Sequence, residues 1–341
     1  QINCDGKKWT VTPVEVSAEI LKELVYQISD RYKEVKDVVI TVPADFNDTQ
    51  VRDTKEAGKL AGLNVIGILR EPTAASLAFD LEEKINGDVL VYDLGGGTFD
   101  ATLVSITGGK TSNEVKSFDP YGFDEPSEEK DSKLNYVVKA TRGDSHLGGD
   151  DFDKEMYNIL CKKLRVMGVD PSLIPDVYRE ELILRLEKLK KESVMGTFTM
   201  TIDYTPKGRN KKPVNVEVTI NHNDFFQATN VIFNKSKALV DELLRSYSGK
   251  LGAIILVGGS TKNVFIKKLL ECYGVRVYTE LNPDEAVALG AGVQARNIKF
   301  GDSNITVLDV LSHGIGVLAD GRILNLIPRD SMVPTSTTKV F

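Results

Sequence analysis

The segment Asp93-Leu94-Gly95-Gly96-Gly97-Thr98-Phe99-Asp100 joins two short apolar runs, residues 89–92 and 101–104. Both runs have the length and composition of strands, which predicts a hairpin with a tight turn. Three consecutive glycines leave the backbone N–H groups of the turn open to a large anion, because no Cβ covers them. A glycine-rich hairpin alone is most often only a turn. The acidic residues at both ends and the Thr98 hydroxyl favour a loop that holds phosphate groups.

The composition predicts a globular protein with two lobes or domains. The chain has 341 residues, of which 41% are apolar and 27% charged, and its net charge is −6. A mildly acidic chain favours neither nucleic acid nor an anionic membrane as a partner. Three scattered cysteines fit a reducing, cytoplasmic location better than a disulfide framework or a zinc site. The sequence starts without methionine and stops within an apolar pattern, so we expect both ends to be cut.

The first 88 residues alternate predicted helices and strands. Helices are expected from Ser17, with apolar residues 20–28 on one face, from Asn47 or Asp48, and from Glu71; strands are expected at residues 38–42 and 65–69. The first strand is expected to be buried on both faces and to end at Pro43. This alternation predicts a largely parallel sheet with helices on its faces. A break at residues 86–88 marks the expected lobe boundary.

The rest of the chain contains predicted strands and helices without regular alternation. Strands are expected near residues 136–138, 198–203, 214–220 and 254–257, and helices from Gly148-Gly149, over 176–192, over 224–244 and from 282–285. Residues 108–133 have clustered acids and two prolines, which predicts a solvated loop. A linker is expected at residues 301–304, and residues 305–341 have a β-like pattern.

The chemistry of the predicted strand ends favours a nucleotide cleft. Hydrolysis of a phosphoanhydride mainly needs amides around the phosphates and carboxylates that hold Mg²⁺ and water. Asp93 and Glu71 each lie at the end of a predicted strand, although Glu71 could equally cap its own helix. Residues 95–97 supply amides and Thr98 a hydroxyl, while residues 258–260 could hold the ribose and the α-phosphate from the other side.

Six segments together resemble the seventy-kilodalton heat-shock chaperone family. They occur in the order of the family and span nearly the whole chain: Val42–Asp48, Arg70–Ala75, Asp93–Asp100, Gly143–Asp153, Leu256–Thr261 and Asn282–Ala288. The resemblance implies an α/β fold of the actin-like ATPase (ribonuclease H-like) type, with two lobes around an ATP cleft. Residues 1–87 would form the remainder of lobe I and residues 88–303 lobe II, including a C-terminal helix that returns toward lobe I. Residues 304–310 resemble the interdomain linker, and residues 311–341 resemble the start of a truncated peptide-binding β domain.

The same resemblance implies roles for individual residues. Asp93 and Glu71 would orient Mg²⁺ through its waters, and Thr98 would contact the γ-phosphate. The other implied nucleotide-binding residues are Gly95, Gly96, Gly97, Gly148, Gly149, Glu187, Lys190, Lys191, Gly258, Gly259, Ser260, Lys262 and Asp284. Pro43 would belong to a switch that relays the nucleotide state to the linker. Without the resemblance, Glu187 and Lys190 would be interpreted as an exposed helix face.

The chain also departs from the family pattern. The family begins with a strand and an Asp-Leu-Gly-Thr-Thr phosphate loop, and nothing similar precedes Trp9. The first lobe is therefore expected to be incomplete, and another polypeptide or a missing segment is expected to complete it. Lys191 and Lys262 replace two arginines that stack on the adenine, which predicts weaker binding of the base. Asp45 replaces an aromatic residue, and Val51 replaces an arginine in the switch region.

These features predict an ATP-binding and ATP-hydrolysing molecular chaperone that acts in protein folding and the stress response. Its expected cofactors are ATP or ADP and Mg²⁺, and its expected partners are unfolded or extended peptides and co-chaperones. Two alternatives stay open. One is a divergent, non-cycling family member with a structural or interaction role. The other is a sugar or metabolite kinase on the same fold.

Overall fold

The computed structural model describes residues 2–4, 7–31, 35–82, 86–108, 134–192, 197–206, 212–301, 305–311, 313–319, 321–333 and 335–338. The helices are α1 Pro13–Ile28, α2 Asp48–Leu60, α3 Glu71–Glu82, α4 Gly149–Val166, α5 Asp176–Glu192, α6 His222–Arg245, α7 Val264–Leu270 and α8 Ala286–Phe300, with short 3₁₀ turns η1 Pro171–Leu173, η2 Gly259–Lys262 and η3 Glu271–Tyr273. Within these described ranges, no helix has the length and apolar character needed to cross a membrane.

The strands are β1 Ile2–Cys4, β2 Lys7–Trp9, β3 Asp37–Val42, β4 Asn64–Arg70, β5 Gly87–Leu94, β6 Phe99–Thr107, β7 Leu134–Asp144, β8 Phe198–Tyr204, β9 Val214–Ile220, β10 Leu251–Val257, β11 Arg276–Tyr278, β12 Ile305–Val310, β13 Ile315–Ala319, β14 Arg322–Ile327 and β15 Met332–Val333. The predicted loop at residues 108–133 lies outside the described residues, apart from its first position. The positions of the expected helices and strands are largely confirmed.

A seven-stranded sheet forms the centre of the molecule, in the order β11-β10-β5-β6-β7-β12-β15. The pairs β10–β11, β10–β5 and β12–β7 are parallel, whereas β5–β6, β6–β7 and β12–β15 are antiparallel. Strands β5, β6 and β7 follow one another along the chain as antiparallel neighbours, so this sheet is mixed. The parallel pairing expected in the first part of the chain is confirmed for β3 and β4, which form a separate two-stranded sheet.

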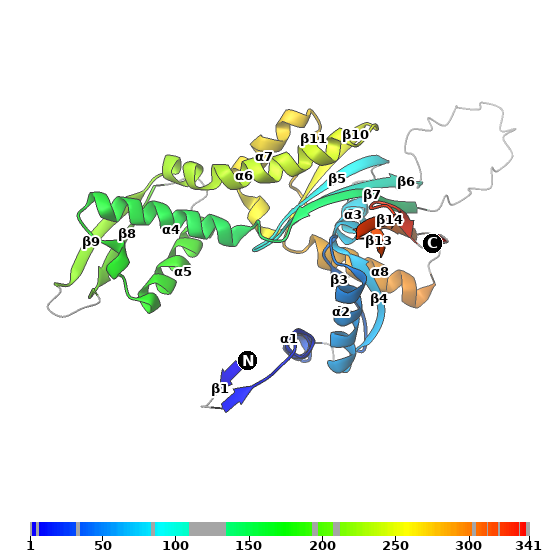
Figure 1. Ribbon diagram of the computed structural model, residues 1–341, viewed down its shortest axis with the longest axis horizontal. Helices are drawn as coiled ribbons and strands as arrows, with labels where there is room; N and C mark the ends of the chain where they lie inside the picture. The colour runs from blue at the N-terminus through cyan, green and yellow to red at the C-terminus, as the bar shows by residue number, and fades with distance from the viewer. Residues whose placement is uncertain are drawn as a thin grey trace, which may run out of the picture.

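The predicted hairpin at Asp93–Asp100 is confirmed as the junction of β5 and β6. Asp93 pairs with Asp100 and Leu94 with Phe99, and the Gly95 N–H donates to the Thr98 carbonyl at 3.0 Å. Alternate residues of β5 face opposite sides of the sheet, as the period of two requires. Val89 and Val91 pack with α3 and α8, whereas Leu90 and Tyr92 pack with α6 and α7. The glycine turn lies at one end of β5 and β6, two central strands that helices cover on both faces (Figure 1).

An outer unit extends from the sheet and is made of α4, α5, β8 and β9 (Figure 1). Its core is a separate apolar cluster that includes Met156 and Leu160 of α4 and Leu182 and Leu186 of α5. Strands β8 and β9 pair in antiparallel register from Phe198–Ile220 to Tyr204–Val214. Lys190, in the last turn of α5, donates to the Gly149 carbonyl at the N-terminus of α4, and the Gly149 N–H donates to Gly95, so both helix ends lie beside the glycine loop.

The first part of the chain contains the parallel pair β3–β4 between two helices. Ile40 and Val65 face α2, whereas Val39 and Gly67 face α8. The expected burial of residues 38–42 on both faces is wrong, because only Val42 is buried and the others are half-buried. The physical reason is that β3 and β4 form a sheet of only two strands among the described residues, so their outer edges stay uncovered.

Helix α1 begins earlier than predicted. Thr12, and not Ser17, is its N-cap: the Thr12 hydroxyl accepts from the Glu15 N–H at 3.2 Å, and the Glu15 carboxylate accepts from the Thr12 N–H at 2.7 Å. The apolar residues between 20 and 28 also do not share one buried face. Leu21 and Val25 are half-buried on the side of α2, whereas Ile20 and Leu24 are more than half exposed.

Helix α8 begins later than predicted, at Ala286. The residues 282–285 form a turn in which the Asn282 carbonyl accepts from the N–H groups of Glu285 and Ala286. The Asn282 side chain accepts from the Asp284 N–H at 3.2 Å. Asn282, which the sequence predicts as the start of the helix, therefore closes the turn before the helix.

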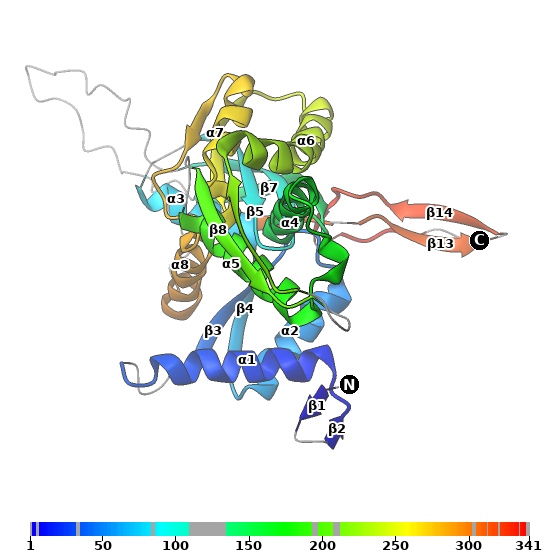
Figure 2. The same cartoon turned by 90° about the vertical axis from the view of Figure 1, so that its left-hand side faces the viewer.

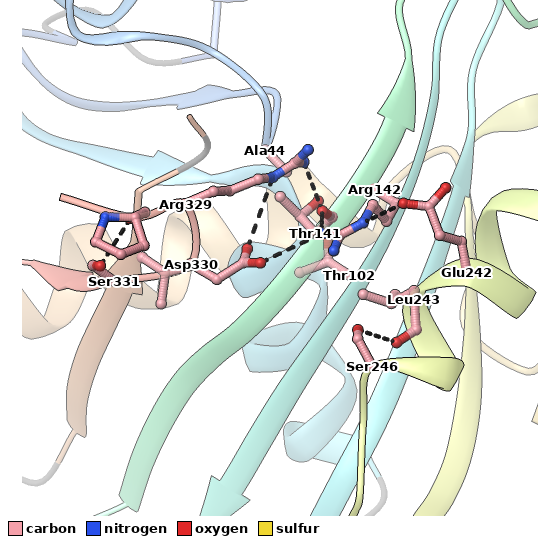
Figure 3. A network of polar contacts seen from close by, with 12 residues as sticks. Ala44, Thr102, Thr141, Arg142, Glu242, Leu243, Ser246, Arg329, Asp330 and Ser331 are labelled. Atoms are coloured by element: carbon pink, nitrogen blue, oxygen red, sulfur yellow. Dashed lines mark hydrogen bonds and ion pairs between the residues drawn. The ribbon is translucent and has the colours of Figure 1, made fainter. Parts of the chain in front are cut away.

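Residues after α8 return to the central sheet. Strand β12 pairs with β7 from Ile305–Leu134 to Leu308–Val137, and β15 adds to the outer edge of β12. Near this edge, Arg142 of β7 lies between Glu242 of α6, at 3.0 Å, and Asp330, at 3.4 Å, and Arg329 donates to the Thr141 carbonyl at 2.7 Å (Figure 3). The hairpin β13–β14 projects away from the body as a separate arm (Figure 2).

Candidate functional site

Three loops from distant parts of the sequence meet at the glycine turn. The Ser260 hydroxyl donates to the Gly95 carbonyl at 2.9 Å, and the Gly149 N–H donates to the same carbonyl at 3.0 Å. The Asp150 N–H donates to the Gly96 carbonyl at 2.7 Å. Loop 95–98, the N-terminus of α4 and the start of η2 are therefore fixed to one another by hydrogen bonds. The sequence analysis assigns these three loops to one nucleotide site, and in the structure they are in contact.

Two glycines make this close packing possible. A Cβ on Gly258, whose φ is +85°, would lie 2.7 Å from Oδ1 of Asp93. A Cβ on Gly148 would lie 2.6 Å from both the Gly96 carbonyl oxygen and the Gly97 nitrogen. Both distances are too short for any side chain, so only glycine fits at either position. The carboxylate of Asp93, at the end of β5, is in this way held next to the loop that follows β10.

A cavity of about 480 Å³ opens between this loop cluster and the outer unit. Most of the predicted nucleotide-binding residues line it: Gly96, Gly149, Glu187, Lys190, Lys191, Gly259, Ser260, Lys262 and Asp284. The other predicted residues lie outside this lining: Pro43, Glu71, Asp93, Gly95, Gly97, Thr98, Gly148 and Gly258. Gly95, Gly148 and Gly258 belong to the loops that support the cavity, and Gly97 and Thr98 belong to the turn itself.

The predicted residues of α5 that line the cavity form two different kinds of ion pair. The Lys190 ammonium contacts Asp153 of α4 at 2.7 Å and donates to the Gly149 carbonyl at 3.1 Å. This pair is mostly buried and joins α5 to the first turn of α4. Lys191 instead contacts Glu187 of its own helix at 2.6 Å, and both side chains are accessible to solvent. On the facing wall, Lys262 contacts Asp284 at 2.5 Å.

A group of carboxylates lies at the ends of β3, β4 and β5. Burial raises the pKa of Asp93 to about 6. Burial, and then the nearby Asp93 and Asp45, raise the pKa of Glu71 to about 7. Asp100 has the highest value, because burial, followed by Asp45, Asp93 and Glu71, raises its pKa to about 8 against the opposing effect of Arg70. The acidic residues are therefore close enough to repel one another when ionised.

The register of β3 and β4 explains how Asp45 reaches this group. Val42, the last residue of β3, pairs with Arg70, the last residue of β4, so the turn after β3 lies beside Glu71 at the start of α3. The Arg70 guanidinium donates to the carbonyls of Pro43, Ala44 and Phe46 at 3.1, 3.1 and 2.8 Å. The predicted switch residue Pro43 is thus part of a turn that Arg70 holds.

Several residues of this region were not assigned by sequence. Asp150, Phe152, Asp153, Phe225 and Asn263 also line the cavity. Asp150 and Asp153 could have been found, because they follow a Gly-Gly pair at a predicted helix start. Phe225 carries no local signal, since its position depends on how α6 packs against the outer unit. Asp45 and Asp100 were noted in the sequence, but their approach to Glu71 depends on the strand register.

The carboxylates do not form a direct ligand set for a metal. Among the described residues, no group of three or more His, Cys, Asp or Glu side chains is arranged to hold a metal ion. One buried atom of this region nevertheless lacks a partner there: Oδ1 of Asp100 accepts no hydrogen bond from any described residue. A hydrated cation that donates through its water molecules is compatible with both observations.

Comparison with known proteins agrees with this arrangement. The family model described as "Hsp70 protein" matches residues 1–120 and 132–341. The chain is 35% identical to "Chaperone protein dnaK" of Cyanidioschyzon merolae, over 100% of this chain and 53% of that protein. It is 33% identical to the protein of the same name from Cyanophora paradoxa, over 100% of this chain and 52% of that protein, and 35% identical to "Chaperone protein DnaK" of Deinococcus proteolyticus, over 100% and 51%.

The chain thus spans about half the length of the curated relatives that it matches. The matched family model covers nearly every residue, including the three loops and the carboxylates described above. The chain belongs to the Hsp70 protein family.

Proposed function

We propose that this chain binds and hydrolyses Mg-ATP at the cavity between the glycine loops and α5. The observation that carries the proposal is the convergence of loop 95–98, the α4 N-terminus and η2 on the Gly95 carbonyl. Glycine-rich backbone beside a helix N-terminus is a favourable place for phosphate groups, because no Cβ covers the backbone and the helix dipole favours negative charge; the Gly149 and Asp150 N–H groups themselves bond within the loop cluster. The cavity of about 480 Å³ has the size of a small-molecule site.

The carboxylates support a role for Mg²⁺ in this proposal. The unpaired Oδ1 of Asp100 and the raised pKa values of Glu71 and Asp100 indicate a site in which negative charge is crowded. Asp93 and Glu71 would hold the ion through its water molecules, and Thr98 would contact the terminal phosphate. A bound Mg²⁺ would supply neutralisation of phosphate charge. The protein residues would orient its waters and fix the polyphosphate against the glycine loops.

We further propose the two-lobed, actin-like ATPase arrangement for the chain. Residues 1–87 would contribute to the first lobe, residues 88–303 would form the second, residues 304–310 the linker and residues 311–341 the start of a peptide-binding β domain. The separate sheet of β3 and β4 and the seven-stranded sheet support this division. The position of β12 beside β7 supports a linker that contacts the second lobe.

The whole protein would be a chaperone that couples nucleotide hydrolysis to the binding and release of extended peptides, with co-chaperones as partners. The relatives carry the name chaperone protein, which supports this proposal. A non-cycling member of the family is the second candidate, and the exposed pairs Lys191–Glu187 and Lys262–Asp284 favour it, because they offer a base little binding surface. Family membership leaves no basis for the kinase alternative.

Titration calorimetry with Mg-ADP, together with phosphate release from ATP, tests the proposal. We expect the 341-residue chain to bind Mg-ADP, and Asp93→Asn to lower phosphate release about a hundredfold while ADP still binds. Asp203→Asn, on an exposed position of β8, is the matched control and should change neither quantity. Binding of ADP without hydrolysis would favour the non-cycling candidate. Failure to bind ADP would contradict a nucleotide site in this chain.

A further inference from the structure

A second cavity, of about 540 Å³, lies between α4, β9 and the start of α6. Three consecutive residues of β9 line it: Glu217, Val218 and Thr219. Neighbouring side chains of a strand point to opposite faces of the sheet, so a cavity that meets three residues in a row meets the strand along its edge. The cavity therefore lies against main-chain groups of β9 and not against one face of the β8–β9 sheet.

The pairing of β8 with β9 shows which main-chain groups reach this edge. On β8, the Thr201 carbonyl accepts from Arg185 of α5 at 3.0 Å, and the Asp203 N–H donates to the Tyr178 hydroxyl at 2.8 Å. Thr201 and Asp203 therefore direct these groups away from β9. Residues directly opposite each other in an antiparallel pair either bond to each other or both point away. Because Glu217 lies opposite Thr201, its N–H and C=O groups point outward, toward the cavity.

The same argument applies to Thr219, two residues further along β9. Thr219 lies opposite Thr199, and the two hydroxyl oxygens are 3.0 Å apart. Such close side chains are typical of antiparallel pairs that no main-chain hydrogen bond joins. The outer edge of β8 is contacted by α5, whereas the edge of β9 directs the N–H and C=O groups of Glu217 and Thr219 to the cavity. A row of such groups is a template for one added strand.

The inner wall of the cavity is apolar. Val218 of β9, Ile159 of α4 and Ala228 of α6 line it and are 2%, 9% and 3% exposed. At the end of α4, Val166 and Met167 also line the cavity, and they are 89% and 47% exposed. Since Val218 points to the buried face of its sheet and its two neighbours to the exposed face, an added strand would bury every second side chain beside Val218. Its sequence would therefore alternate apolar and polar residues.

The charges around the cavity favour a basic segment. Glu155, Glu217 and Asp224 supply three carboxylates and Lys162 and Lys163 two ammonium groups, so one negative charge is in excess. Lys163 is paired with Asp224 at 2.8 Å. Glu217 lies on the exposed face of its strand, where a lysine or arginine directly opposite on an added strand would form a favourable cross-strand pair.

From this geometry we propose that the cavity-side edge of β9 is a docking site for an extended segment of a partner protein, which adds a third strand to the β8–β9 sheet. The segment alternates apolar and polar side chains and carries a basic residue opposite Glu217. Main-chain hydrogen bonds give the affinity in this mode of recognition, and pockets for alternate side chains give the specificity. The docking site is separate from the proposed nucleotide cavity, since no described residue lines both.

Fluorescence anisotropy with a labelled peptide, Thr-Val-Lys-Val-Thr-Val-Lys with blocked ends, tests the proposal on the 341-residue chain. We expect saturable binding, and at least a tenfold loss of affinity when every amide nitrogen of the peptide is methylated, because that peptide keeps its side chains but has no main-chain donors. Bound peptide should slow hydrogen exchange at the N–H groups of Glu217 and Thr219 at least tenfold, as followed by NMR. Absence of saturable binding, or binding without slower exchange at these two positions, overturns the proposal.

Two variants of the cavity test its chemistry. Glu217→Lys places like charges opposite the peptide lysines, and we expect it to lower the affinity at least threefold. Glu181→Lys makes the same charge change at an exposed position of α5 and should leave the affinity unchanged. Gln227→Trp, at an exposed position of α6 that lines the cavity, should lower the affinity at least tenfold, because the indole occupies the space of the added strand. Full affinity in both cavity variants would place the peptide elsewhere and overturn the proposal.

Other occupants give different results. Ile323→Lys, on the arm formed by β13 and β14, should leave the affinity unchanged; loss of binding in this variant alone would assign the peptide to the arm and overturn the proposal. Sedimentation velocity of the chain without peptide tests a second copy as the occupant. A dimer that Gln227→Trp disperses would show that another copy of the chain covers the edge, and would overturn the assignment to a partner protein.

Discussion

The guanidinium of Arg70 donates from Nε to Oδ2 of Asp309 at 2.8 Å, although the two residues are 239 positions apart in the sequence. Arg70 ends β4, directly before Glu71, and Asp309 lies in β12, between β7 and the edge strand β15 of the central sheet. The same guanidinium also holds the turn after β3 through three carbonyl oxygens. One side chain therefore joins the segment after α8 to the turn that carries Asp45 and to the start of α3.

Substitution of Arg70 tests how much this contact contributes. Arg70→Gln removes the charge, so Asp309 keeps a partly buried carboxylate without its ion-pair partner. We expect a loss of about 2 kcal/mol in the free energy of unfolding, and faster deuterium uptake in residues 305–310 and 43–46. Arg52→Lys, at an exposed position of α2, is the control. Unchanged uptake in both segments would show that the contact does not hold them together.

The raised carboxylate pKa values predict how stability depends on pH. Because the folded-state pKa values of Asp100 and Glu71, about 8 and about 7, lie above those of the unfolded chain, the folded state binds more protons between about pH 4 and pH 8. Each group therefore makes stability fall as the pH rises through this interval. We expect the ligand-free protein to be less stable at pH 8 than at pH 5, as measured by urea unfolding.

Asp100→Asn should remove a large part of this dependence, because the amide stays neutral at every pH. We expect the variant to be more stable than the parent chain at both pH values, with the clearly larger difference at pH 8. Asp203→Asn, on an exposed position of β8, should leave the slope unchanged. A parent chain whose stability rises steadily from pH 5 to pH 8 would contradict the crowding of carboxylates described here.

Gly258→Ala should disturb the loop that follows β10. Alanine at a φ of +85° is strained, and its Cβ would lie 2.7 Å from the Asp93 carboxylate. We expect a loss of at least about 2 kcal/mol in the free energy of unfolding, together with loss of Mg-ADP binding. Gly292→Ala is a matched control, because its Cβ would meet no atom within 4 Å and it lies inside α8. That control should stabilise the protein by about 0.5–1 kcal/mol.

The buried pair of Lys190 and Asp153 can be analysed by a double-mutant cycle. Lys190→Met should cost about 3 kcal/mol, since it leaves the Asp153 carboxylate buried and unpaired. The double variant Lys190→Met and Asp153→Leu should recover most of that loss, because the charge is removed with its partner. Urea unfolding of the four proteins gives the coupling energy. Additive losses would show that the pair does not act as a unit.

Local signals predicted the glycine hairpin well. Two apolar runs of strand length flank Gly95-Gly96-Gly97, and no tertiary contact is needed to recognise the turn between them. The same kind of signal exists at Thr12-Pro13-Val14-Glu15, where a capping box and a proline mark the start of α1. The predicted cap Ser17 is wrong, because this stronger pattern precedes it. The true start of α1 is therefore encoded locally and depends on no tertiary contact.

Other features depend on contacts between distant residues. The half-exposed state of β3 follows from the number of strands beside it, which residues 38–42 do not encode. The meeting of Asp45 with Glu71 follows from the pairing of Val42 with Arg70. Likewise, the ion pair of Lys262 with Asp284 needs the turn before α8 to lie beside η2. The family resemblance, more than local patterns, identified most of the residues that line the cavity, but neither could give these pairings.

The arm formed by β13 and β14 has a consequence for handling the protein. Its strands are paired only with each other among the described residues, and Leu318 and Ile323 are 72% and 79% exposed. A ribbon with apolar side chains and unpaired backbone groups along its edges is a template for strand pairing between molecules. Self-association at high concentration should therefore begin at this arm, and a lysine at position 323 would suppress it while leaving the glycine loops untouched.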